Sequence, residues 1–172
     1  MALEKLQPRL TAFSDTGQNY GLFKVLAAMY DIIHSQSLTS AGLAIKAGAS
    51  AIVKTGVSTW VGIAEGVLVS KAAATDMAAL SGTVTNAKFN VFAFFVNSAG
   101  TVRSAMGTEG ATLATVVFPT RAEGEALIGF IVVNPTGTGN FVGGTTALDD
   151  ATVVPNVVYC NPVGAFDPTI GY

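Results

Sequence analysis

The spacing of the apolar residues changes once along this chain, and that change restricts the fold more than any other feature. Before residue 35 they recur every three or four residues, which places them on one face of a helix: Leu22, Leu26, Met29 and Ile33. From Ala41 onward the apolar residues alternate with polar or small ones, which is the period of a β-strand. The sequence therefore predicts an N-terminal arm and helix over residues 1–40 and a β-domain over residues 41–172.

The predicted helix runs from Thr16 to His34, with Asp15 as its N-cap and Gln18 in capping-box spacing. Apolar side chains occupy most of its circumference, so the helix has to be covered on more than one side. We expect one surface to cover the β-domain and the other to contact a second chain. The candidate interaction residues are Leu22, Phe23, Leu26, Met29, Tyr30 and Ile33.

The β-domain is expected to consist of short strands separated by turn residues. An aromatic-rich run at 89–96 is apolar on both faces and predicts a buried central strand, and Glu65-Gly66 predicts a hairpin turn. Strands are expected at 43–47, 57–63, 67–69, 89–96, 101–106, 113–118, 126–133 and 152–159, and a turn or single helical turn at 72–80. This pattern favours a mainly β fold, a jelly-roll-like antiparallel β-sandwich preceded by the N-terminal α-helix.

The chain is poor in charge, because only 12% of its residues are charged where about 25% is usual. A surface with so few charges is expected to be covered by partners, and we predict a homo-oligomer, a trimer in preference to a dimer. The 9 basic residues form no cluster that would bind nucleic acid. Residues 126–148 lack charge, but Asn134 and Pro135 interrupt them, so no membrane-spanning helix is expected.

The residue types that carry chemistry are few and scattered. The single histidine, His34, is expected to cap the end of the helix, and the single cysteine, Cys160, to be a packing residue without a partner for a disulfide. The acid pairs Glu123/Glu125 and Asp149/Asp150 lack the spacing of a cation-binding loop. We therefore predict no enzymatic activity, no bound metal and no cofactor.

A glycine-rich loop and a scattered set of aromatic residues are further candidates for binding sites. The loop 135–146 is rich in glycine but has neither the third glycine of a dinucleotide fingerprint nor the lysine of a phosphate loop, so it predicts a tight connection between strands. Aromatic residues that could stack on sugars are spread along the chain, and packing is their expected role: Tyr20, Tyr30, Trp60, Tyr159 and Tyr172.

Residues 127–146, which include Asn134-Pro135-Thr136-Gly137, and then 148–150 and 154–156, resemble a family of tailed-bacteriophage virion structural proteins. The stretch from Lys71 to Val84 fits the same family, and the resemblance extends from Gly42 to Pro168. It implies a β-rich, non-enzymatic component of the particle, a capsid decoration or cement protein that binds the major capsid protein. It also implies a protein made in the bacterial cytoplasm and located on the capsid surface.

Two alternatives stay open from the sequence. The chain is also compatible with a receptor-binding or carbohydrate-binding module of a head or tail fibre, in which loop aromatics and acids would contact sugar. A component of the tail tube or connector is the other alternative, and ring assembly of the isolated protein would indicate it.

Overall fold

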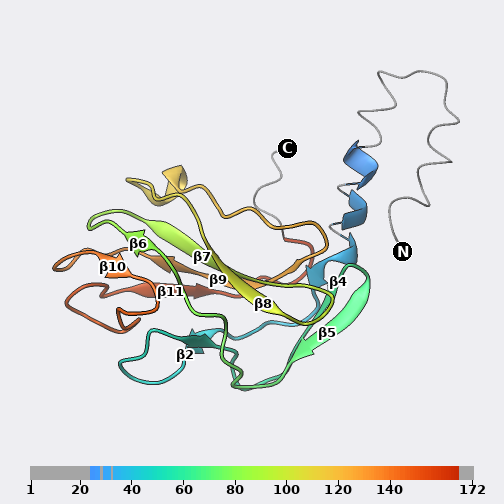
Figure 1. Ribbon diagram of the computed structural model, residues 1–172, viewed down its shortest axis with the longest axis horizontal. Coiled ribbons are helices and arrows are strands. Elements are labelled where there is room, and N and C mark those ends of the chain that lie inside the picture. The colour runs from blue at the N-terminus through green and yellow to red at the C-terminus, as the bar shows by residue number, and fades with distance from the viewer. Residues whose placement is uncertain (1–23, 28, 32, 167–172) are drawn as a thin grey trace, which may run out of the picture.

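The computed structural model describes residues 24–27, 29–31 and 33–166. Over these residues the protein is mainly β, with antiparallel sheets, a short N-terminal helix and no closed barrel. The strands pack together into one unit, which we call the body, and the helix lies at one end of it (Figure 1). They are β1 (Gln36–Ser37), β2 (Ala44–Ile45), β3 (Val53–Lys54), β4 (Trp60–Ala64), β5 (Val67–Lys71), β6 (Thr83–Val84), β7 (Asn90–Val96), β8 (Val102–Met106), β9 (Ala126–Val133), β10 (Phe141–Val142) and β11 (Val157–Cys160).

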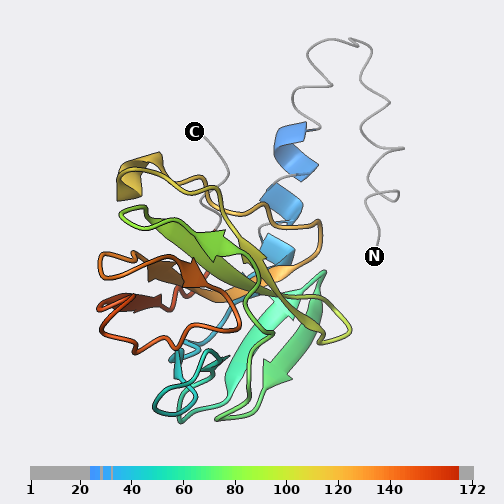
Figure 2. The same ribbon diagram turned by 60° about the vertical axis from the view of Figure 1, so that its left-hand side comes forward.

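The largest sheet has four strands in the order β11-β9-β7-β8, all antiparallel to their neighbours. A three-stranded sheet, β1-β4-β5, and the pairs β10-β6 and β2-β3 complete the described body (Figure 2). Strand β7 pairs on both sides, and every one of its residues is buried because both faces of the sheet are covered there, as the apolar run at 89–96 predicted. A register shift between Phe94 and Phe95 interrupts its pairing with β9.

One main core lies between a face of the four-stranded sheet and the smaller sheets. Its largest fully buried side chains include Phe92, Phe94, Ile131 and Phe141, together with Trp60 of β4. The indole Nε1–H of Trp60 donates to Ser37 Oγ at 3.1 Å, and that hydroxyl donates to the Leu127 carbonyl at 2.5 Å. These two bonds join β1, β4 and β9, so the short N-terminal strand β1 is part of the body.

Several predicted elements are confirmed by the structure. The hairpin β4-β5 turns at Glu65-Gly66, where both residues have positive φ (52° and 76°), the conformation of a two-residue type I′ turn. The strands expected at 101–106 and 126–133 are β8 and β9, and a turn over 97–100 precedes β8. Of the last strand, expected at 152–159, only the part after Pro155 is found: β11 begins at Val157 and lies at an edge of the four-stranded sheet, while residues 152–156 are not in a strand.

Other predictions were wrong in detail. The run 113–118 is not a strand; it forms the 3-10 helix η2 (Leu113–Thr115) and an isolated bridge between Val117 and Thr108. The segment 72–80, by contrast, contains a turn at residues 73 and 74, one of the two forms predicted for it, and a bridge between Asp76 and Lys54. Strand β4 begins at Trp60 instead of residue 57, because its pairing with β5 begins at Trp60 opposite Lys71; Val57 lies outside it and is 98% exposed. The buried face of β4 carries Trp60, Gly62 and Ala64.

Candidate interaction surfaces

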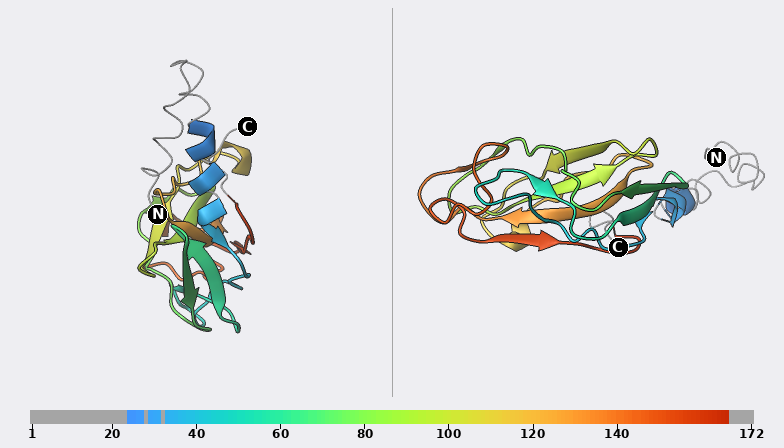
Figure 3. Two further views of the ribbon diagram at one scale, coloured as in Figure 1. Left: turned by 90° about the vertical axis from the view of Figure 1, so that its right-hand side faces the viewer. Right: turned by 90° about the horizontal axis from the view of Figure 1, so that it is seen from below.

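The N-terminal helix projects from one end of the body, and the side views agree on this placement (Figures 1, 2 and 3). Four large apolar side chains of its described turns are exposed by 40–56%: Val25, Leu26, Met29 and Ile33. Residues 25, 26, 29 and 33 share one side of a helix. We call these four residues the helix stripe. Leu22 and Phe23 of the predicted set lie outside the described residues.

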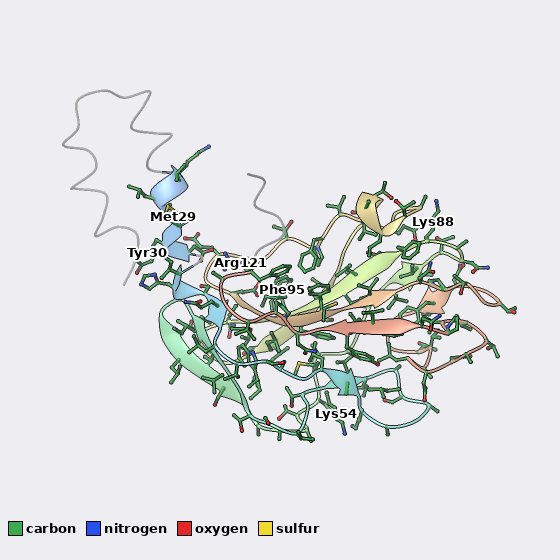
Figure 4. The ribbon with its side chains drawn as sticks, turned by 180° about the vertical axis from the view of Figure 1, so that it is seen from behind. Met29, Tyr30, Lys54, Lys88, Phe95 and Arg121 are labelled. Atoms are coloured by element: carbon green, nitrogen blue, oxygen red, sulfur yellow. The ribbon has the colours of Figure 1, made fainter. Side chains whose placement is uncertain are left out.

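The opposite side of the helix holds it to the body. Asp31 is two residues from both Met29 and Ile33 and so points away from the stripe. Its carboxylate pairs with Arg121 and accepts the backbone N–H of Gly124 at 3.1 Å. Figure 4 shows Arg121 at the base of the helix, close to Tyr30. The prediction that an apolar surface of the helix covers the β-domain is therefore wrong for the described turns, because a polar side makes this contact.

A second ion pair continues the attachment into the sheet. Arg103 of β8 donates from Nε and Nη2 to the two carboxylate oxygens of Glu125, at 2.7 and 2.5 Å. The Arg103 guanidinium also lies 4.5 Å from the ring centroid of Phe95, and Arg121 donates to the Glu125 carbonyl at 2.6 Å. Glu125, expected only as a loop acid, thus links the helix base to the sheet. Arg103 and Glu125 are 22 residues apart in the sequence, and no sequence motif predicts that they pair.

The outer face of the four-stranded sheet, turned away from the main core, contains an open groove of about 610 Å³. Its floor includes the cross-strand row Val91, Val132 and Val158, which are direct partners on β7, β9 and β11. One wall comes from η2 and the chain that follows it. We call this the sheet groove; it is lined by Phe89, Val91, Leu113, Val116, Phe118, Phe130, Val132, Asn134, Asn156, Val158 and Cys160.

The chemistry of the sheet groove is uniform, because none of its lining residues carries a formal charge at neutral pH. Phe130 contacts Phe118 edge to face at 5.2 Å and stacks on Phe166 at 6.0 Å. Two of its lining residues, Val158 and Leu113, are 53% and 54% exposed. This surface was not predicted from the sequence. A signal for it was present, because β7 and β9 carry apolar residues on both faces, which indicates that the outer face of the sheet also has to be buried by other residues.

The single histidine and the single cysteine, the candidates for catalytic roles, have structural roles: His34 has partners at the helix end and Cys160 is half-buried. His34 Nδ1 lies 2.9 Å from the Tyr30 carbonyl and its ring stacks on Tyr30 at 3.7 Å, which is the helix-end role expected of it. Cys160 is half-buried, and this burial raises the pKa of its thiol. Within the described residues no three His, Cys, Asp or Glu side chains gather as metal ligands.

The carboxylates of Asp149 and Asp150 stabilise loops separately. Asp149 accepts the backbone N–H of Ala49 at 3.0 and 3.1 Å. Asp150 accepts from the hydroxyl and the backbone N–H of Thr152, and these bonds lower its pKa. The two acids therefore act on different segments and form no shared acid pair.

The aromatic residues that could stack on sugars, for which packing was predicted, do not form an open platform in the described part of the chain. Trp60 is fully buried, and Tyr30 is covered on one side by His34. Tyr159 is half-buried beside the main core, and burial raises its pKa. Tyr20 and Tyr172 lie outside the described residues.

The glycine-rich loop is a tight connection, as the sequence predicted. Gly139 and Gly144 adopt positive φ (92° and 74°), while Gly143 is crowded by the backbone of residues 80–82. Strand β10 lies within this loop and pairs with β6. The loop thus closes one part of the main core through Phe141.

Comparisons with protein-family models, with curated proteins and with solved structures found no match to this chain. No helix within the described ranges is long and apolar enough to cross a membrane. Among the described residues, the helix stripe and the sheet groove are the two apolar surfaces that could bind another molecule.

Proposed function

We propose that this protein is a non-enzymatic structural component of a tailed-phage virion, a capsid decoration protein that binds and stabilises the shell of the major capsid protein. Its fold in this proposal is a jelly-roll-like β-sandwich with an N-terminal helical arm. The proposal rests on the resemblance of residues 42–168 to such proteins and on one structural observation.

The observation is that two separate, uncharged apolar surfaces stay open on a body with few charges. Monomeric proteins rarely expose contiguous apolar patches beyond a few hundred Å², and larger ones mark interaction sites. A decoration protein is covered by neighbouring subunits over part of its surface, and open apolar surfaces are where such contacts form. The helix stripe and the sheet groove lie on different parts of the molecule, which suits a subunit with more than one neighbour.

The fibre-module alternative draws less support from the described residues. A sugar-binding platform needs exposed aromatic faces beside polar groups. Trp60 is buried, Tyr30 is stacked on His34, and the aromatic residues of the sheet groove have only the amides of Asn134 and Asn156 near them. Oligosaccharides would find few hydrogen-bonding partners there.

Co-sedimentation with empty capsids of the phage that encodes the chain tests the proposal. The protein is expected to pellet with capsids at a fixed ratio to the major capsid protein and to raise the temperature at which they open. Binding to a glycan array without capsid binding would support the fibre module instead, and ring assembly of the isolated protein without capsid binding would support a tail or connector component.

A further inference from the structure

We infer that the helix stripe of one copy docks in the sheet groove of a second copy, so that the subunits associate head to tail. The inference rests on the proposed function only in taking a second copy as the neighbour. Its evidence is the position, charge and size of the two surfaces.

The helix stripe faces away from its own body. Asp31 and His34 lie on the side of the helix that contacts residues 121–124 and Gly66, whereas Met29 and Ile33 are 52% and 56% exposed. The sheet groove reaches Phe89, next to Lys88, at the end of the body opposite the helix (Figure 4). A helix anchored in this way does not cover its own groove, and no other part of the chain within residues 24–27, 29–31 and 33–166 covers the helix stripe or fills the groove.

The charges of the two surfaces are compatible. The groove lining contains no charged side chain, so a charged occupant would lose its hydration without gaining a partner. The helix stripe contains no charged residue either, and the carboxylate of Asp31 is on the opposite side of the helix. The stripe therefore presents the only kind of surface that this groove accommodates at low cost.

The dimensions agree as well. The row Val91, Val132 and Val158 crosses three neighbouring strands, and two interstrand spacings amount to about 10 Å. A helix with its side chains has a diameter of about 10 Å, and the eight-residue step from Val25 to Ile33 is about 12 Å long. A helix laid into an apolar groove through anchors three and four residues apart is a common mode of recognition between proteins.

Head-to-tail contacts have a consequence for assembly. Each copy offers one stripe and one groove, so no stripe or groove is left uncovered when the subunits close, either as a reciprocal two-fold pair or as a ring. A closed ring of three agrees with the predicted trimer. The same contact would cover Cys160, which lines the groove.

Two charge-inserting variants test the inference in the absence of capsids. Met29→Lys places a charge in the helix stripe, and Val158→Lys places one in the sheet groove at a residue that is 53% exposed on the edge strand β11. Leu68→Lys is the matched control, because Leu68 is 67% exposed on β5, outside both surfaces. Circular dichroism confirms folding, and Leu113→Lys in the same groove replaces Val158→Lys if that variant does not fold.

Light scattering is expected to show an oligomer for the wild type and the control, and a monomer of 17.5 kDa for each variant alone. Self-association should weaken by about tenfold or more, since each variant leaves a charge unpaired in an apolar contact. Mixing the two variants is the decisive step. The intact helix of the groove variant can dock in the intact groove of the helix variant, so a 1:1 dimer should form.

The outcomes separate this inference from competing ones. A wild type that is monomeric at micromolar concentration, or two monomeric variants that fail to pair on mixing, overturns it. A groove variant that still assembles shows that helices pack on helices, and also overturns it. Slower alkylation of Cys160 in the wild type than in Met29→Lys supports it.

Capsid binding is measured separately from these steps. A wild-type monomer that still pellets with capsids would overturn the head-to-tail contact and leave the proposed function standing. Variants that pair on mixing, together with a wild type that does not bind capsids, would support the head-to-tail contact and overturn the proposed function.

Discussion

The two faces of the four-stranded sheet have similar compositions but different surroundings. On the inner face Phe92, Phe94 and Ile131 are fully buried in the main core. On the outer face Phe130 and Val132 are only half-buried and Val158 is 53% exposed. The comparison shows that the apolar residues of a strand indicate that a face of the sheet has to be buried. They do not indicate which part of the protein, or which other chain, buries it.

The outer face itself differs between its two ends. Near the helix it is closed by the Arg103 guanidinium, which lies over Phe95 and is held by Glu125. Toward the other end the sheet groove leaves Val132 and Val158 open. Ionic groups therefore complete the apolar surface at one end, whereas the described residues leave it open at the other.

The largest expected effect comes from truncating an aromatic residue of the covered face. Phe94→Ala should lower the free energy of unfolding by about 3–5 kcal/mol, because it leaves a cavity in a fully packed core. Val158→Ala on the open face should change it by about 0.5 kcal/mol or less in the monomer. Denaturant titration of both variants measures the difference. Equal losses would show that the outer face is as tightly packed as the inner one.

The ionic cover at the helix end is expected to have a smaller but definite effect. Glu125→Gln should cost about 1.5–3 kcal/mol, since the Glu125 side chain is 12% exposed and accepts two bonds from Arg103. Asp76→Asn breaks the Lys46 pair, whose side chains are 46% and 43% exposed, and should cost less than about 1 kcal/mol. Thermal unfolding of both variants compares them. A loss at Asp76 as large as that at Glu125 would contradict the role assigned to burial.

The glycine-rich loop offers the same contrast between covered and open positions. A Cβ at Gly144 would lie 2.8 Å from the Leu80 carbonyl oxygen, whereas one at Gly139 meets no atom within 4 Å. Both residues have positive φ, so Gly139→Ala should cost about 1 kcal/mol and Gly144→Ala up to about 3 kcal/mol. The shift in unfolding midpoint gives the ranking, and wild-type stability of both variants would show the loop to be conformationally ordinary.

The smallest effect concerns the thiol in the sheet groove. Burial raises the pKa of Cys160, so at a given pH less thiolate is present in the folded protein than in the unfolded chain. Alkylation at neutral pH should therefore be slower in the folded state, and its rate should rise as the pH approaches the raised pKa. A rate equal to that of the chain in denaturant, at every pH, would show that the groove is fully hydrated at Cys160.

The sequence predicted those elements whose pattern is local. The strands β7, β8 and β9 and the hairpin at Glu65-Gly66 follow from apolar runs of strand length bounded by turn residues. The 113–118 run was misassigned because its β-forming residues have no neighbouring strand to pair with beyond one bridge at Val117. Residue preference alone does not supply the hydrogen bonds that make a strand.

What the sequence by itself determined is the mainly β character, the central strand β7, the helix before the β-domain and the low charge. The tertiary structure alone decided which surfaces stay open. It attached the helix through Asp31 and Arg121, residues 90 positions apart, and so turned the helix stripe outward. It also brought Val91, Val132 and Val158 into one row. These contacts depend on pairing between distant segments, and no local pattern of residues specifies that pairing.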